Sequence, residues 1–172
     1  MKELETERLI LRYITRDDVP AIYNNWANDP RVAEYLTWNA HESISDTNAV
    51  MDFWLDEYKN DNCYRYGIER KSDHELMGMI DVVGYHHGDP VIGYCSGRRF
   101  WNCGYMSEAL KAVVNELISE GYRKIVAEAV RENIGSNRVI IKSGFKLVDS
   151  REAELSALKK QKVTINSYRF YA

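Results

Sequence analysis

The feature that most constrains the fold is an amphipathic helix that begins directly after a glycine turn. Apolar residues recur at three- and four-residue steps from Met106 to Ile118, and Gly121 follows them. This spacing places the apolar side chains along one stripe of a helix, which a glycine can end by adopting a left-handed conformation. Such a stripe must be buried, so the chain needs a sheet or further helices beside it.

Strand-like segments supply that second layer. Segments with alternating or β-branched apolar residues, separated by turn residues, predict strands. We expect these strands over residues 8–14, 63–69, 76–85, 91–96, 124–130, 145–148 and 163–171. Helices are expected up to Ala27, where Asn28-Asp29-Pro30 ends the pattern, after Ser45, and from Asn133 to Ser143. The order of elements predicts one mixed α+β sheet with helices on its faces.

Length and composition indicate a globular protein. A chain of 172 residues suits one domain, and no repeat or linker divides it. The net charge of −3 favours neither nucleic acid nor an anionic membrane as a partner. No apolar run reaches the roughly 20 residues of a membrane helix, and the first residues do not resemble a signal peptide. We therefore expect a cytoplasmic protein without membrane or nucleic-acid partners.

The cysteine and histidine pattern predicts no metal site. Three cysteines without C-x-x-C spacing disfavour a disulfide framework and a zinc knuckle, and free thiols suit a reducing compartment. The adjacent His86 and His87 lie in an expected hairpin loop and point in different directions, so solvation explains them better than metal binding.

The turn before the amphipathic helix is a candidate anion site. Unpaired N–H groups at the positive end of a helix attract phosphate, and Gly104 lets the backbone approach a ligand closely. Arg98 and Arg99 add positive charge. One glycine alone fits a simple turn equally well. No G-x-x-x-x-G-K-[ST] or G-x-G-x-x-G motif is present, which disfavours ATP and NAD.

Several motifs, this turn among them, follow one another in a fixed order along the chain. They are Ile92-Gly93-Tyr94, Trp101-Asn102-Cys103-Gly104-Tyr105-Met106-Ser107-Glu108, Glu132-Asn133-Ile134-Gly135-Ser136 and Gly144-Phe145. Together they resemble the GNAT (GCN5-related) N-acetyltransferase superfamily, in particular the branch of the ribosomal-protein N-terminal acetyltransferases. The resemblance is close over residues 90–148, and residues 5–12 also resemble the opening strand of that branch.

The resemblance implies a fold and a cofactor. The fold would be a single N-acetyltransferase domain over residues 1–172, with a mixed, mostly antiparallel central sheet of about seven strands and helices on both faces. The cofactor would be acetyl-CoA, the acetyl donor, with no metal. Its pyrophosphate would lie in the family loop Q/R-x-x-G-x-G/A, in which this chain keeps Gly104 but has Trp101 and Met106 in place of the first and last residues.

The resemblance also implies where the cofactor lies along the sheet. Strand 91–96 would splay from strand 124–130, and the pantetheine arm would fill the gap like an added strand. The residues that would contact the cofactor are Tyr94, Cys95, Ser96, Arg99, Trp101, Asn102, Cys103, Gly104, Tyr105, Met106, Ser107, Asn133 and Ser136.

Acetyl transfer to an amine needs a stabilised oxyanion and a proton for the leaving thiolate. A backbone N–H near Cys95 or Ser96 would contact the oxyanion. Many GNAT enzymes protonate the thiolate with a tyrosine, but Ile140 occupies that position here. The resemblance makes Ser136 the candidate donor, with Asn133 holding pantetheine or a water. Asn133 also fits the role of a helix cap, and the two roles are compatible.

The general base is the least determined part of the site. Glu128 lies within an apolar strand, where a carboxylate is costly unless it is paired or used, so it is the first candidate. Glu69 and Asp81 on neighbouring strands are the alternatives. A strand carboxylate is more often paired with Arg or Lys than catalytic.

The acceptor implied by the resemblance is a primary amine. It is either a protein N-terminal α-amine or a small-molecule amine, and Glu34, Glu42 and Asp46 near the cleft would favour a cationic acceptor. The alternative function is a non-catalytic acyl-CoA-binding or regulatory module of the same fold. A homodimer is common among proteins that resemble this one, but the sequence identifies no interface.

Overall fold

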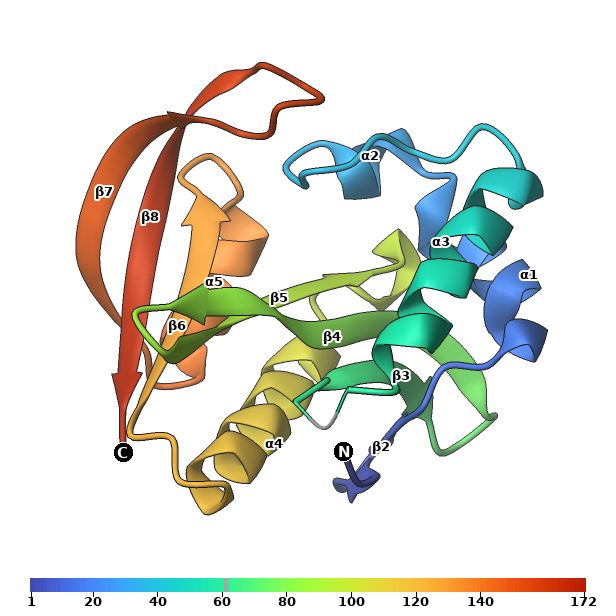
Figure 1. Cartoon of the computed structure of the whole chain (residues 1–172), viewed down its shortest axis with the longest axis horizontal. Helices are drawn as coiled ribbons and strands as arrows, with labels where there is room; N and C mark the ends of the chain where they lie inside the picture. Colours follow the sequence, from blue (N-terminus) through green and yellow to red (C-terminus); the bar gives the residue numbers. More distant parts are fainter. Residues whose placement is uncertain (61) are drawn as a thin grey trace.

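The computed structural model describes residues 1–60 and 62–172 (Figure 1). Three short 3-10 or π segments, labelled η, accompany its helices and strands. In chain order the elements are β1 (Leu4–Glu5), β2 (Leu9–Arg12), η1 (Arg16–Asp18), α1 (Val19–Ile22), η2 (Tyr23–Ala27), α2 (Pro30–Ala33), α3 (Ile44–Glu57), β3 (Arg65–Arg70), β4 (Glu75–His86), β5 (Asp89–Ser96), η3 (Arg98–Phe100), α4 (Tyr105–Ser119), β6 (Lys124–Val130), α5 (Ile134–Lys142), β7 (Lys146–Glu154) and β8 (Lys162–Tyr171).

The strands form one sheet in the order β1-β2-β3-β4-β5-β6-β8-β7. Every neighbouring pair is antiparallel except β5 and β6, which run parallel. The predicted mixed, mostly antiparallel α+β sheet is confirmed. The sheet has eight strands where about seven were expected, because β1 contributes only Leu4 and Glu5. Two residues are too short to show a strand periodicity.

Helices cover both faces of the sheet (Figure 1). The helix predicted from residue 106 is α4, and its stripe of Ala109, Leu110, Val113, Val114 and Leu117 is fully buried in one core with the sheet and Ile140 of α5. Residues of α1, η2 and α3 form a second core on the opposite face, against Leu76 and Met79 of β4. The two cores fix the sheet between two helical layers.

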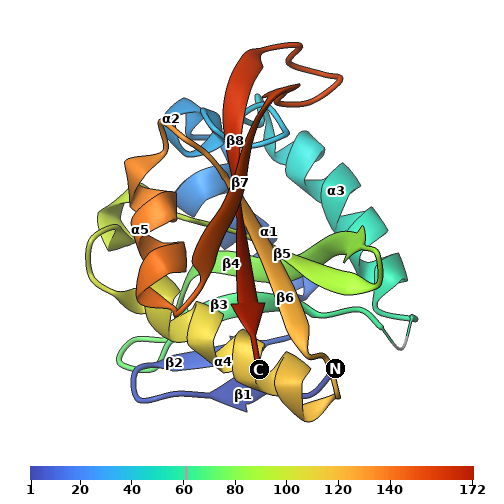
Figure 2. The ribbon, with the colours of Figure 1, turned by 90° about the vertical axis from the view of Figure 1, so that its left-hand side faces the viewer.

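Strands β5 and β6 pair over only two residues each. The register joins Val91 to Val126 and Ile92 to Ala127, whereas β5 continues to Ser96 and β6 to Val130. Figure 2 shows the two strands diverging beyond this short contact. The predicted splay between strands 91–96 and 124–130 is therefore confirmed, and it begins after Ile92.

Two helix boundaries differ from the sequence prediction. Asn28-Asp29-Pro30 ends one helical segment but also starts α2, because the Asp29 side chain accepts a hydrogen bond from the Arg31 N–H at 2.9 Å and proline suits the first turn. Helix α3 begins at Ile44 with Ser43 as its N-cap and Asp46 completing a capping box, so the predicted cap at Ser45 was wrong.

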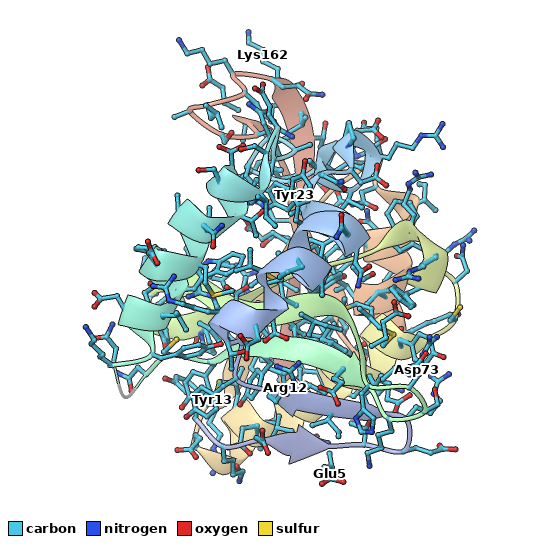
Figure 3. The ribbon with its side chains drawn as sticks, turned by 90° about the vertical axis from the view of Figure 1, so that its right-hand side faces the viewer. Glu5, Arg12, Tyr13, Tyr23, Asp73 and Lys162 are labelled. Carbon is cyan, nitrogen blue, oxygen red and sulfur yellow. The ribbon has the colours of Figure 1, made fainter. Side chains whose placement is uncertain are left out.

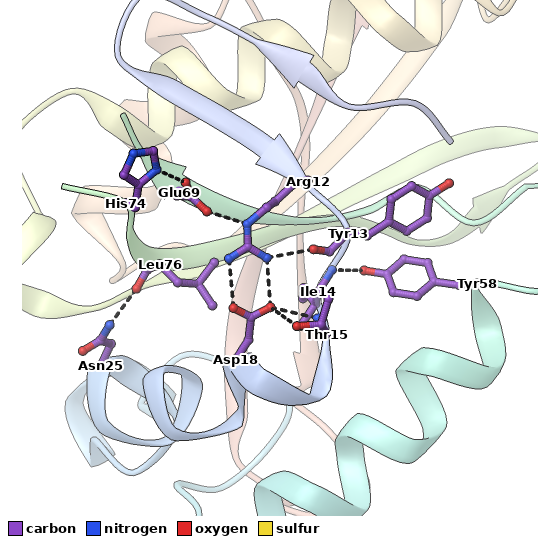
Figure 4. Close-up of polar contacts among 10 residues, drawn as sticks. All are labelled: Arg12, Tyr13, Ile14, Thr15, Asp18, Asn25, Tyr58, Glu69, His74 and Leu76. Atoms are coloured by element: carbon purple, nitrogen blue, oxygen red, sulfur yellow. Dashed lines mark hydrogen bonds and ion pairs between the residues drawn. The ribbon is translucent and has the colours of Figure 1, made fainter. Parts of the chain in front are cut away.

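Arg12 ties the first helical segment to the sheet (Figure 4). Its guanidinium donates two hydrogen bonds of 2.9 Å to Asp18 and one of 2.5 Å to Glu69 on β3, and Glu69 also contacts His74 Nδ1 at 2.7 Å. Beside it, the Tyr58 hydroxyl accepts from the Ile14 N–H at 3.0 Å. These bonds hold the chain where it leaves β2 for the second core.

The hairpin of β7 and β8 projects from the other end of the sheet (Figures 2 and 3). Figure 3 shows Lys162, the first residue of β8, far from Glu5 at the opposite edge. Strand β7 runs to Glu154, beyond the predicted end at residue 148. The Lys159 side chain in the hairpin loop donates to the backbone carbonyl of Ala33 in α2. This hydrogen bond joins the β7–β8 hairpin to α2.

The described part of the chain contains no helix with the length and apolar character needed to cross a bilayer.

Gly78 allows β5 to approach β4 closely. A Cβ at this position would lie 2.3 Å from the Cys95 carbonyl oxygen and 2.8 Å from Ser96 Cα, both backbone atoms. We predict that Gly78→Ala destabilises the protein by about 1–3 kcal/mol, the usual cost of overpacking. Gly84→Ala on the same strand is the control, because nothing lies within 4 Å of its added Cβ. Urea unfolding of both variants measures the difference, and equal stabilities would contradict the prediction.

Candidate functional site

The turn from Trp101 to Gly104 leads into the N-terminus of α4. Gly104 is the N-cap residue with φ +82°, and Asn102 also has a positive φ of +61°. The first helical N–H groups, those of residues 105–107, lack acceptors inside the helix and point out of its positive end. Glycine adopts this left-handed conformation without strain. The turn therefore has the geometry of the predicted anion site.

Arg8, which the sequence analysis did not select, braces this turn. Its side chain donates to the Cys103 carbonyl at 3.1 Å and to Glu108 at 2.7 Å, and its guanidinium lies 4.4 Å from the centre of the Tyr105 ring. Glu108 also accepts from Thr6 at 2.6 Å. Burial alone would raise the pKa of Glu108, but these hydrogen bonds outweigh it and the pKa is lowered.

The two arginines of the turn point away from it. Arg99 donates to Asn25 Oδ1 at 2.8 Å and pairs with Glu75, and Arg98 pairs with Asp29. These contacts connect η3 to η2, to the start of α2 and to β4. The predicted contact between Arg99 and a phosphate would require these bonds to break. Arg8 supplies the positive charge that the structure places beside the turn.

The main-chain groups of β5 alternate between β4 and the gap. The Gly97 N–H donates to the Met77 carbonyl at 2.9 Å, so by the antiparallel alternation Cys95 also pairs with β4. The N–H and carbonyl groups of Tyr94 and Ser96 face the gap instead. The Ser96 carbonyl accepts from the Trp101 indole at 2.9 Å. Of the three residues predicted to bond a ligand through their main chain, Tyr94 and Ser96 are suitably oriented and Cys95 is not.

Helix α5 brings Asn133 and Ser136 to the other side of the gap. Asn133 is the N-cap of α5, and its Oδ1 accepts from the Ser136 N–H at 3.1 Å, which confirms the predicted capping role. The Tyr94 hydroxyl lies 2.9 Å from Ser136 Oγ and 3.1 Å from the Ser136 carbonyl oxygen, and its single proton can bond either acceptor. The structure therefore brings Tyr94, Asn133 and Ser136 together.

Asn137, which is 8% exposed, fixes the position of α5. Its amide donates to the carbonyls of Val130 at 2.9 Å and Asn133 at 2.7 Å. Its Oδ1 accepts from Asn166 at 2.9 Å and from the Tyr168 hydroxyl at 2.5 Å, both on β8. The sequence could have indicated such a network, because Asn137 lies on the buried side of its helix, where a polar side chain needs hydrogen-bond partners.

The candidate base Glu128 lies in an ion pair on the face of β6 opposite the α4 core. Both of its oxygens accept from Arg151 at 2.8 Å, and Ser167 donates to it at 3.0 Å. The Arg151 hydrogen bonds lower the pKa of Glu128, against a smaller effect of burial. Glu69 has a lowered pKa as well, because its bonds to Arg12 and His74 outweigh its burial. These contacts suit structural carboxylates better than proton acceptors.

Asp81 differs from the other two carboxylates. It lies on β4 opposite Gly93, beside the start of the gap, and is 8% exposed. Burial raises the pKa of Asp81, although Arg65 donates to its Oδ2 at 3.0 and 3.1 Å and opposes the rise. Arg65 is also paired with Glu57. Of the three candidate carboxylates, Asp81 is therefore the one whose pKa is raised.

Two further residues are explained by packing. Burial raises the pKa of the Cys95 thiol to about 12, so it is protonated and a poor nucleophile at neutral pH. Ile140, which the resemblance places where many GNAT enzymes would have a tyrosine, is 1% exposed and lies in the core with α4. The hydroxyl groups at the gap come from Tyr94 and Ser136.

Comparison with known proteins identifies the family. A sequence model of the acetyltransferase (GNAT) domain matches residues 8–146. The "Uncharacterized N-acetyltransferase YoaA" of Bacillus subtilis (strain 168) is 36% identical over 148 residues, covering 83% of this chain and 81% of that protein.

Solved structures share the fold. RimL, a ribosomal L7/L12 α-N-protein acetyltransferase in complex with coenzyme A, superposes with a TM-score of 0.86 at 20% identity, covering 99% of this chain and 98% of that one. Microcin C7 self-immunity acetyltransferase MccE, in complex with acetyl-CoA and AMP, gives 0.86 at 20% identity, covering 97% and 94%. With the family match across most of its length, the chain belongs to the GNAT family and is an acetyltransferase.

Proposed function

We propose that the protein transfers an acetyl group from acetyl-CoA to a primary amine by direct attack in a ternary complex. The observation that carries this proposal is the gap between β5 and β6, which has the turn of α4 at one side and the N-terminus of α5 at the other. Support comes from the solved structures of the same fold that hold coenzyme A or acetyl-CoA.

In this proposal the cofactor binds along the gap. The pyrophosphate lies against the N–H groups of residues 105–107, with Gly104 allowing close approach and Arg8 nearby. The pantetheine arm bonds to the main chain of Tyr94 and Ser96 as an added strand would. The thioester then lies between β5 and Ser136 of α5. A β5 N–H that faces the gap stabilises the oxyanion.

The proton transfers use groups on the two sides of β5. The amine nitrogen attacks the carbonyl carbon, and its surplus proton passes to Asp81, directly or through water. The C–S bond then breaks with its electron pair on sulfur, and Ser136 protonates the thiolate. Glu128 was the first candidate for the base, but its bidentate pairing with Arg151 and lowered pKa favour Asp81.

The acceptor is a primary amine of a protein N-terminus or a small molecule. The relative in complex with coenzyme A is described as an α-N-protein acetyltransferase, which supports the first class. The acidic residues Glu34, Glu42 and Asp46 lie at or near the surface around α2 and α3 and support a cationic acceptor. The alternative function, a non-catalytic acyl-CoA-binding module, predicts that CoA binds but that no acetylated product forms.

Release of free thiol from acetyl-CoA, followed across a panel of amines and N-terminal peptides, tests the activity. We expect amine-dependent thiol release with at least one acceptor class, because the site holds both an acid and a base. Mass spectrometry of the acceptor should show one added acetyl group. Binding of CoA without thiol release for any acceptor would instead support the binding module.

Cofactor binding is tested by thermal unfolding. At 100 times its dissociation constant, a ligand of the native state adds about 2.7 kcal/mol of stability. For a chain of this size that raises the melting temperature by roughly 5–10 °C. We expect this shift with acetyl-CoA and with CoA, and a smaller one for Arg8→Met at the same concentration, since that variant loosens the turn. Arg16→Met, which removes an exposed ion pair with Asp52, is the control.

The base is tested with Asp81→Asn. We expect kcat/KM to fall about 100-fold, within the usual contribution of general base catalysis. A base acts when it is deprotonated, and the pKa of Asp81 is raised. As the pH is lowered, kcat/KM of the wild type should therefore begin to fall at a pH above the usual pKa range of a carboxyl group. This limb should vanish in the variant.

Glu128→Gln is the matched control for this substitution and should keep both the rate and the acid limb. The reverse pattern, with loss of the limb only in Glu128→Gln, would identify Glu128 as the base. Melting temperatures of both variants separate an effect on catalysis from the cost of leaving Arg65 with Glu57 as its remaining partner.

A further inference from the structure

The Tyr94 side chain extends from β5 to α5 on one face of the sheet. Its hydroxyl lies 2.9 Å from Ser136 Oγ and 3.1 Å from the Ser136 carbonyl oxygen. Tyr94 faces the α4 and α5 side of the sheet and packs against that core, so the ring is held on one face. This contact joins β5, which carries the oxyanion site of the proposed mechanism, to the proposed proton donor.

A serine hydroxyl rotates freely about its Cβ–Oγ bond and needs a partner to fix the direction of its proton. Tyr94 is such a partner, because a phenol both donates and accepts. When the Ser136 proton points at sulfur, Ser136 Oγ accepts the single proton of Tyr94, which otherwise bonds the Ser136 carbonyl oxygen. The same bond stabilises negative charge on that oxygen as the proton leaves for the thiolate.

We propose that Tyr94 is a positioning residue that directs the Ser136 hydroxyl toward the thioester sulfur and stabilises Ser136 as it gives up its proton. The inference rests on the proposed function, because it requires Ser136 to be the proton donor. Tyr94 keeps its own proton throughout. The proton that reaches sulfur comes from Ser136, and a solvent proton replaces it in the same step, so that no serine alkoxide is left beside the thiol.

The chemistry of the buried phenol agrees with this division of roles. Burial raises the pKa of Tyr94, with a smaller opposing effect from its hydrogen bond to Ser136. A tyrosinate there would be costly, so Tyr94 is protonated at neutral pH and remains able to donate a hydrogen bond to Ser136. Ile140 of α5 is buried in the core and offers no hydroxyl. The hydroxyl beside Ser136 is that of Tyr94 on β5.

A double-mutant cycle tests the proposal with Tyr94→Phe, Ser136→Ala and the combined variant. The phenylalanine keeps the ring and removes only the hydroxyl. We expect Tyr94→Phe to lower kcat roughly tenfold, the effect of losing one hydrogen bond that acts in the transition state. The KM for acetyl-CoA should change less than about twofold, because the main-chain contacts of β5 remain. In the Ser136→Ala background the same substitution should have no further effect.

The outcomes separate this inference from the proposed function. An unchanged kcat in Ser136→Ala would overturn the proton donor itself. Two results would overturn the role of Tyr94 and leave Ser136 as the donor. In the first, kcat falls in Ser136→Ala but not in Tyr94→Phe. In the second, both single variants lose kcat and the two losses multiply in the double variant. Tyr122→Phe is the control, because its hydroxyl contacts only Tyr85, at 3.4 Å, among the described residues. Equal melting temperatures confirm that Tyr94→Phe folds normally.

Discussion

The short pairing between β5 and β6 is the constraint on which the rest of the site depends. Backbone N–H and carbonyl groups in a sheet normally find partners on the next strand, and an unpartnered buried group is costly. Here the ladder stops after Ile92 and Ala127, while both strands continue. The sheet therefore carries an internal edge. An extended ligand that offers amide groups can satisfy this edge as a strand would.

Two polar anchors keep the gap open by holding its walls separately. On one side, Gly78 lets β5 lie unusually close to β4, and the Ser96 carbonyl is held by the Trp101 indole. On the other side, Asn137 bonds α5 to β6 and β8 with all of its amide atoms used. Each wall is rigid in itself. The separation of the walls thus follows from packing on either side and does not need a ligand to impose it.

Much of this architecture was predictable from local patterns. The stripe of α4, the strand at residues 124–130 and the cap at Asn133 depend on neighbours close in sequence, and the structure confirms them. What escaped prediction depends on distant contacts. Arg98 and Arg99 stand beside the turn in sequence, yet Asp29, Glu75 and Asn25 hold them elsewhere. Arg8 lies about a hundred residues before Glu108, and no local pattern connects the two.

The candidate base also could not be chosen from local sequence. An acidic residue in an apolar strand signals either a pair or a function, and the sequence offers no means of choosing between them. The outcome depends on whether desolvation or the hydrogen bonds to charged donors is the larger effect at each group. Glu128 and Glu69 are each bonded by an arginine that outweighs burial, and their pKa values fall. For Asp81 desolvation is the largest effect, and its pKa rises although Arg65 donates to it. The proton affinity of the three carboxylates is therefore set by the balance between desolvation and their arginine hydrogen bonds, and each arginine lies on a different strand from the carboxylate it contacts, so local sequence does not reveal that balance.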